Sequence, residues 1–170
     1  MENSLLVRPI GTVCASGDGF RIEVSPSFRP ALMGLDAFGW VQILWWFSGC
    51  DDPASRATLQ ISRPYIRGPE RLGVFSTRSP QRPNPLAVSC AQVLCVDSAR
   101  GAVDLAYLDA ADGTPVLDLK PYTPSLDRVE RPGGPDWCAH WPGSVEASGA
   151  FDWSSEFAFE SQSYDRPGTL

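Results

Sequence analysis

Apolar and polar residues alternate in several short stretches of the chain, which is the pattern of strands with one buried face. Residues 20–24, Phe-Arg-Ile-Glu-Val, alternate strictly after a Gly-Asp-Gly turn, and we predict a strand there. Residues 102–108 alternate in the same way around Asp104. Residues 5–14 are apolar and rich in β-forming types, so we predict that a first strand covers them.

The remaining pattern adds elements of the same kind. Residues 40–47 are apolar on both faces except for Gln42, which predicts a central strand. Residues 87–96 and 102–108 flank a turn and predict a hairpin, and a short strand is expected over 116–119. A short helix over 30–35 begins with Pro30, which the first turn of a helix tolerates. This series favours an antiparallel barrel or sandwich, and we predict a mostly-β fold built on a small antiparallel β-barrel with short helices.

The chain is expected to form one domain over residues 1–170, with residues 131–170 as an irregular C-terminal extension. That extension shows no clear period, and we expect it to wrap the domain through Trp137, Trp141 and Trp153. Sixteen prolines and fifteen glycines indicate many turns, while 43% apolar residues can form a substantial core. The longest apolar run, residues 41–47, is too short to cross a bilayer and no leader pattern is present, so we expect a cytoplasmic protein.

Charge is divided along the chain. Residues 56–85 carry six arginines and a single acid, Glu70, whereas residues 101–170 carry four basic and twelve acidic residues. A nucleic-acid-binding protein usually presents a basic patch, and only the arginine-rich stretch can supply one here. The acidic C-terminal part would repel phosphates.

Several common chemistries are excluded by composition. The single histidine, His140, cannot form a multi-histidine metal site, and no nucleophile elbow accompanies it, so we expect it to pack among aromatic rings. No phosphate-binding loop and no Rossmann glycine motif is present. No cysteine pair has metal-ligand or redox spacing, and we expect small, buried, reduced side chains at Cys14, Cys50, Cys90, Cys95 and Cys138.

Two segments carry unusual chemistry. Residues 73–85 read Gly-Val-Phe-Ser-Thr-Arg-Ser-Pro-Gln-Arg-Pro-Asn-Pro, so that two arginines stand among three prolines. Proline restricts the backbone, and arginine suits two-point contact with a carboxylate or phosphate; the alternative is a stiff surface loop. Residues 112–122 read Asp-Gly-Thr-Pro-Val-Leu-Asp-Leu-Lys-Pro-Tyr, and a short strand there places Asp118 and Lys120 on one face, where a surface ion pair is the alternative role.

Together these two segments resemble the paired signature of the TrmO/TsaA (YaeB-like) family, and the resemblance covers about residues 7–127. It implies a small β-barrel methyltransferase that binds S-adenosylmethionine near a homodimer interface. The family's characterised activity, N6-methylation of threonylcarbamoyladenosine at position 37 of tRNA, makes tRNA the implied partner. No metal and no membrane are implied.

The resemblance also assigns site residues, while the catalytic residues stay unassigned. Cofactor contacts are implied at Ser48, Gly49, Arg78, Val88, Asp112, Gly113, Thr114 and Pro115. We expect an adjoining pocket to be shaped by Arg82, Asn84, Asp118 and Lys120. Arg56 lies in the less specific part of the arginine-rich stretch, and we expect its replacement to leave cofactor affinity nearly unchanged.

Three features differ from the family pattern. Ser48 stands where the family commonly has histidine, the loop at residues 15–19 is shorter than in tRNA-modifying members, and an acidic tail over 131–170 replaces their separate C-terminal domain. All three differences lie where substrate or cofactor would be handled, so the resemblance implies the cofactor more strongly than the substrate. They leave two alternatives beside tRNA methylation: a methyltransferase of the same fold acting on a small molecule, and a non-catalytic S-adenosylmethionine-binding module.

Overall fold

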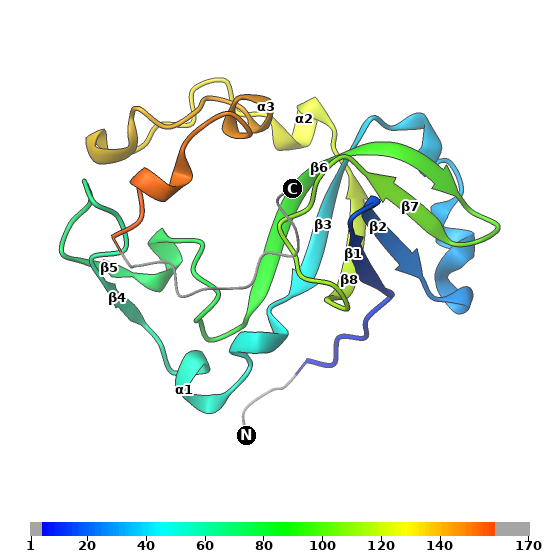
Figure 1. Cartoon of the computed structure of the whole chain (residues 1–170), viewed down its shortest axis with the longest axis horizontal. Coiled ribbons are helices and arrows are strands. Elements are labelled where there is room, and N and C mark those ends of the chain that lie inside the picture. Colours follow the sequence, from blue (N-terminus) through cyan, green and yellow to red (C-terminus); the bar gives the residue numbers. More distant parts are fainter. Residues whose placement is uncertain (1–4, 159–170) are drawn as a thin grey trace.

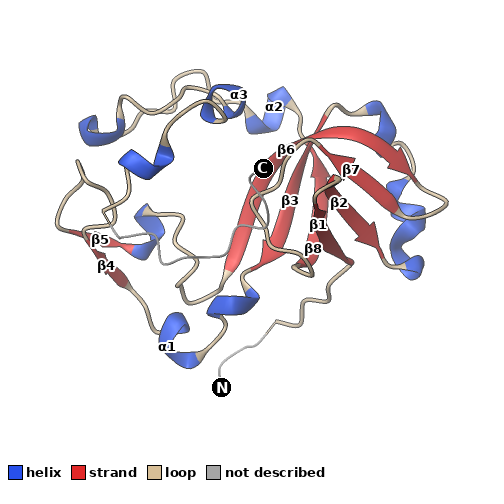
Figure 2. Cartoon of the chain, in the orientation of Figure 1, coloured by secondary structure: helices blue, strands red, loops and turns tan. Residues whose placement is uncertain are grey.

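The computed structural model describes residues 5–158 and contains the predicted barrel. Six antiparallel strands close on themselves in the order β1-β2-β7-β6-β3-β8 (Figures 1 and 2). Their bounds are β1 Gly11–Ser16, β2 Gly19–Val24, β3 Trp40–Trp46, β6 Leu86–Asp97, β7 Ala102–Leu105 and β8 Pro115–Pro121.

The barrel forms because alternate residues of each strand point into a shared core. Val13 pairs with Ile22, and Ile22 pairs in turn with Val103, and all three side chains are completely buried. Removing one such side chain from water stabilises the fold by about 1.5–3 kcal/mol. Arg21 and Asp104 pair on the outer face, where their side chains form an ion pair of 2.6 Å. The alternation seen in the sequence is therefore the inside and outside of the barrel.

The first strand and the predicted helix differ from expectation. The strand begins at Gly11 instead of Leu5, because β2 ends opposite Gly11 at Val24. Leu5 is 92% exposed. In place of a helix over 30–35 there are two 3-10 helices, η1 Pro26–Leu32 and η2 Leu35–Ala37. They are separated at Gly34, whose φ of +84° is left-handed and cannot continue a helix.

The other strand predictions are confirmed with shifted ends. The hairpin of β6 and β7 is present, but β7 ends at Leu105, three residues before the predicted end. Its turn closes through Gly101, with a φ of +78° and a backbone bond from Gly101 N to the Asp97 carbonyl of 2.8 Å. The last barrel strand, β8, is longer than predicted because it pairs along most of β3.

A long excursion, which we call the arm (residues 51–85), leaves the barrel after β3 and returns at β6. It contains α1 Pro53–Arg56, the hairpin of β4 Gln60–Ser62 with β5 Arg71–Gly73, and the 3-10 helix η4 Val74–Ser76. It follows the short 3-10 helix η3 Ser48–Cys50. In Figure 1 the arm lies to the left of the barrel, with its hairpin farthest away.

The C-terminal segment, residues 129–158, runs from the barrel toward the β4–β5 hairpin and closes a ring with the arm (Figure 1). It follows α2 Pro124–Asp127 and contains η5 Asp136–Cys138, α3 Val145–Ser148 and η6 Trp153–Ser155. The three tryptophans that we expected to wrap the domain, Trp137, Trp141 and Trp153, form one aromatic cluster, in which Trp137 and Trp141 pack on Tyr65 of the arm. The rest of the predicted 131–170 extension lies outside the described residues.

The expectations for the cysteines and His140 are met only in part. All five cysteines are free thiols, but Cys50 is the one that is buried and Cys95 is exposed, so the expectation of small buried side chains was wrong for most of them. His140 packs near Phe151, with ring centroids 6.2 Å apart, and hydrogen-bonds Glu156.

Candidate functional site

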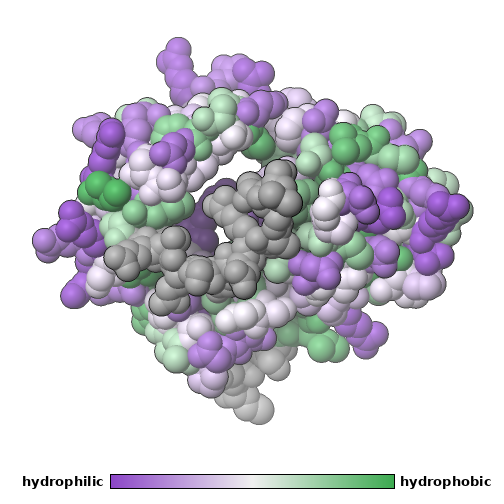
Figure 3. Space-filling view, in the orientation of Figure 1, coloured by the Kyte–Doolittle hydropathy of each residue, from purple (hydrophilic) through white to green (hydrophobic). Residues whose placement is uncertain are grey.

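A cleft of about 670 Å³ lies where the arm faces β3 and β6. The barrel contributes mainly apolar and aromatic side chains, and the arm contributes arginine and other polar groups. Figure 3 shows the molecule open in the middle, between the barrel and the arm. The lining residues are Trp45, Phe47, Phe75, Thr77, Arg78, Arg82, Asn84, Leu86, Ala87, Val88, Ser89 and Asp109.

Arg78 and Val88, two residues singled out from the sequence, are in direct contact. A guanidinium nitrogen of Arg78 donates to the Val88 carbonyl at 3.1 Å, which ties the arm to β6. Arg82, on the same loop, has a weak contact of 3.5 Å with the Ser79 carbonyl, and Asn84 completes the polar side of the cleft. Within residues 5–158 neither arginine forms an ion pair. The cleft therefore offers positive charge that is available to an anionic group.

The loop that carries these arginines is fixed locally. Thr77 caps the turn of η4, since its hydroxyl donates to the Val74 carbonyl at 2.9 Å and accepts from the Ser79 backbone at 3.2 Å. Pro80, Pro83 and Pro85 restrict the backbone that follows. The prediction of an ordered loop that presents its arginines agrees with this geometry.

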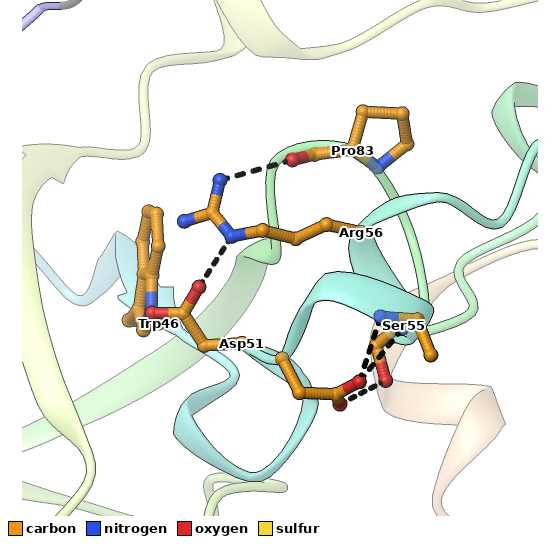
Figure 4. A network of polar contacts seen from close by, with 7 residues as sticks. Trp46, Asp51, Ser55, Arg56 and Pro83 are labelled. Atoms are coloured by element: carbon orange, nitrogen blue, oxygen red, sulfur yellow. Dashed lines mark hydrogen bonds and ion pairs between the residues drawn. The ribbon is translucent and has the colours of Figure 1, made fainter.

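Arg56 anchors the far end of the same loop (Figure 4). Its guanidinium pairs with Asp51 and donates to the Pro83 carbonyl at 3.2 Å, and it lies 5.4 Å from the ring centre of Trp46. Hydrogen bonds from Arg56 and Trp46 lower the pKa of Asp51, so this carboxylate stays charged. Nothing in the local sequence indicates this role. Because Arg56 holds the loop that carries Arg78 and Arg82, we no longer expect its replacement to leave cofactor affinity unchanged.

The second motif forms the turn that leads into β8. The side chain of Asp112 accepts from the Ala15 backbone at 3.0 Å, and Gly113 takes a φ of +76°. Gly113 N donates to the Val13 carbonyl, and Val13 N donates to the Thr114 carbonyl, both at 2.8 Å. Pro115 begins β8, next to Val116, which pairs with Trp45 of the cleft. The motif thus lies at the same end of the barrel as the cleft without lining it.

The other predicted site residues also lie outside the cleft. Ser48 and Gly49 are exposed in η3, directly after the cleft residue Phe47. Asp118 and Lys120 lie farther along β8 and form an ion pair of 2.7 Å with each other. In the single chain they therefore form a surface ion pair and do not line the cleft. Hydrogen bonding and charge from Asp118 raise the pKa of Lys120.

Eight of the twelve residues that line the cleft were not predicted from the sequence, among them Trp45, Phe75 and Asp109. Trp45 holds its place by an indole bond of 3.0 Å to the Ser89 hydroxyl, and its ring meets Phe47 edge-on at 4.4 Å. Phe75 is 79% exposed, and a phenylalanine inside an otherwise polar motif was the signal in the sequence that could have identified it. Asp109 comes from the loop between β7 and β8, and nothing in its local sequence indicated the cleft.

These groups suit a ligand that combines an aromatic ring with charges of both signs. Arginine side chains bind carboxylates, aromatic and aliphatic walls accommodate a flat ring, and Asp109 adds one acid for a cationic group. Within residues 5–158 no three His, Cys, Asp or Glu side chains are grouped to hold a metal ion. None of the helices described is long and apolar enough to cross a membrane.

Comparison with known proteins points to one family. The model of the tRNA-methyltransferase O N-terminal domain matches residues 7–128. A Halobacterium salinarum protein named probable S-adenosyl-L-methionine-binding protein is 42% identical over 100 residues, or 59% of this chain and 73% of that protein. The tRNA (adenine(37)-N6)-methyltransferase of Escherichia coli is 37% identical over 149 residues, or 86% of this chain and 60% of that enzyme.

Solved structures agree with these relatives. A crystal structure of TrmO from Pseudomonas aeruginosa superimposes with a TM-score of 0.61 at 28% identity, over 80% of this chain. The superposition covers 62% of the Pseudomonas protein. This chain therefore spans about three fifths of the length of both bacterial enzymes.

Proposed function

Since the chain belongs to the family of the tRNA-methyltransferase O N-terminal domain, we propose that its cleft binds S-adenosylmethionine and that it methylates N6 of the adenine at position 37 of tRNA. The observation that carries the proposal is the cleft at Arg78. There a family-motif arginine, unpaired with any acid of the described chain, stands opposite an apolar and aromatic wall.

The chemistry of the cleft fits this cofactor. Arg78 and Arg82 would bind its carboxylate, and Trp45, Phe47 and Phe75 would contact its adenine ring. S-adenosylmethionine supplies a methyl group on a sulfonium whose leaving thioether is neutral. The protein's main task is then to align the acceptor, and good alignment alone is worth effective molarities on the order of 10⁵ M or more. Asp109 is the carboxylate that can hold the proton lost by the acceptor nitrogen.

We also propose that the working unit is a homodimer. Phe75, Leu86 and Val88 line the cleft and are 79%, 41% and 44% exposed, so one wall of the site is open and apolar. A second copy that covered these residues would enclose the ligand, and it could bring Ser48, Gly49 and the Asp112–Pro115 turn of one protomer toward the cleft of the other. A monomeric mass in light scattering with the cofactor present would contradict this.

The arm is the part suited to tRNA. Arg63, Arg67 and Arg71 lie on or beside its hairpin, and none of them forms an ion pair within residues 5–158. Such arginines suit the phosphate backbone, and we expect tRNA affinity to fall steeply with salt. A small-molecule acceptor is the second candidate, because the net charge of −6 opposes a polyanion.

Mass spectrometry of tRNA nucleosides tests the proposal. A strain without this protein should lack N6-methylated threonylcarbamoyladenosine, and purified protein with labelled S-adenosylmethionine should restore it on tRNA from that strain. Unchanged nucleosides, together with label that enters the small-molecule fraction of an extract, would favour the second candidate. If no label were transferred to any fraction, the protein would be a cofactor-binding module without catalytic activity.

A further inference from the structure

Ser89 brings a hydroxyl group to the cleft, and the protein fixes its oxygen without using its proton. The indole Nε1 of Trp45 donates to Ser89 Oγ at 3.0 Å. An indole nitrogen can only donate, so the serine oxygen accepts in this bond and keeps its own proton. Among the residues that the structure describes, the Ser89 hydroxyl has no second hydrogen-bond partner. Its proton can therefore be donated to another group.

The place of Ser89 on β6 makes this hydroxyl accessible from the cleft. β6 pairs with β3 over residues 86–92, whereas its register with β7 begins at Val93. Side chains alternate along a strand, so Ser89 and Ala87 lie on the same face of β6. Ala87 pairs with Trp45, and all three residues line the cleft. Ser89 is only partly buried there, which leaves room for a contact with a ligand.

A ligand that fills the cleft takes water away from this hydroxyl. Trp45 and Phe47, whose ring centres are 4.4 Å apart, form the aromatic wall beside it. A polar group that loses water and gains no partner weakens binding, whereas a ligand with a matching acceptor restores the lost bond. A ring that binds against this wall is therefore favoured when it presents an acceptor atom to Ser89.

We propose that Ser89 is a specificity-determining residue of the cleft: its hydroxyl, held by Trp45, donates to a ring nitrogen of bound S-adenosylmethionine. This rests on the proposed function, and it names the kind of atom by which the site recognises the cofactor's ring. Adenine offers acceptor nitrogens at N1, N3 and N7. The walls formed by Trp45 and Phe47 would by themselves hold any flat ring of this size.

Deaza analogues of S-adenosylhomocysteine test this, because each replaces one of these three nitrogens by C–H and keeps the shape of the ring. In calorimetry with the wild type, one of the three analogues should bind about tenfold more weakly than S-adenosylhomocysteine, since its C–H leaves the Ser89 proton without an acceptor. Ser89→Ala should bind S-adenosylhomocysteine several-fold more weakly than the wild type does. It should bind that one analogue as well as it binds S-adenosylhomocysteine.

Two further variants separate this effect from damage to the fold. Ser89→Ala leaves the Trp45 indole, which is 5% exposed, without its acceptor, so the melting temperature should fall by about 2–4 °C. The double variant Trp45→Phe, Ser89→Ala removes both partners and keeps an aromatic ring, so it should regain stability and still not distinguish the analogue. Cys90→Ala is the matched control, because Cys90 follows Ser89 on β6 and does not line the cleft. It should weaken the analogue as the wild type does.

The results decide the two claims separately. If the wild type binds S-adenosylhomocysteine and all three analogues equally well, or if the penalty for the analogue persists in Ser89→Ala and in the double variant, Ser89 does not contact the ring. The proposed cofactor site would then stand without this role. If the wild type binds neither S-adenosylhomocysteine nor the analogues at millimolar concentration, the proposed function and the role of Ser89 both fail.

Discussion

Replacing Arg78 by alanine removes the charged group on which the proposed site depends. A hydrogen bond to a charged group is worth about 1.5–3 kcal/mol when it is lost. Arg78 is exposed, and solvent screens its charge, so we take the lower end of that range. A loss of about 1.5 kcal/mol corresponds to about tenfold weaker binding of S-adenosylmethionine.

The fold should survive this change. The bond to the Val88 carbonyl contributes about 1 kcal/mol, which for a chain of this size is about 2–4 °C in melting temperature. Isothermal calorimetry with S-adenosylhomocysteine measures the affinity, and Arg71→Ala is the matched control. Arg71 is an exposed arginine of the same arm that does not line the cleft. Equal affinity of both variants, whether weakened or not, would refute the assignment of Arg78 and indicate a general effect of charge.

Three further changes test other parts of the structure. Arg56→Ala should lower the melting temperature by about 2–4 °C, because the bond to the Pro83 carbonyl is lost, and it should weaken cofactor binding several-fold. Unchanged cofactor affinity would show that Arg56 does not support the site. Gly101→Ala should destabilise the barrel by about 1–3 kcal/mol in denaturant unfolding, because φ is +78° and a Cβ there would lie 2.6 Å from the Val24 carbonyl oxygen; a smaller loss would show that the turn can shift. Because hydrogen bonds with His140 and Trp141 lower the pKa of Glu156 in the folded protein, its charged form stabilises the fold at pH values above the ordinary glutamate pKa of about 4.3. This stabilisation is lost as the pH falls through the lowered pKa of the folded protein. The melting temperature should therefore decline more steeply in acid for the wild type than for Glu156→Gln.

The barrel could be predicted because its signal is local. Strands such as Gly19–Val24 alternate every second residue, since one face packs in the core. Leu5–Val7 look equally suited to a strand but have no partner beyond Val24, and only the register shows this. The helix expected at 30–35 is absent because Gly34 adopts a left-handed conformation, which the sequence allows but does not require.

The residues of the candidate cleft that could be predicted are those whose chemistry is concentrated in one motif. Arg78, Arg82 and Asn84 come from a single loop, and Val88 follows on the next strand. Asp109 and Arg56 were missed because their roles depend on contacts with distant parts of the chain. Arg56 reaches Pro83 across 27 positions. The C-terminal segment shows no period for the same reason: its order comes from packing on Tyr65, more than 70 residues earlier.

The claim that the cleft holds S-adenosylmethionine can be tested by following nuclear magnetic resonance signals during titration with S-adenosylhomocysteine. The indole N–H of Trp45 is held by Ser89 inside the cleft, whereas the indoles of Trp137 and Trp153 lie in the C-terminal cluster. We predict saturable shifts at the Trp45 indole and at the backbone amides of Arg78 and Val88, with little change at Trp153. No shift at millimolar ligand, or shifts confined to residues away from the cleft, would contradict the account.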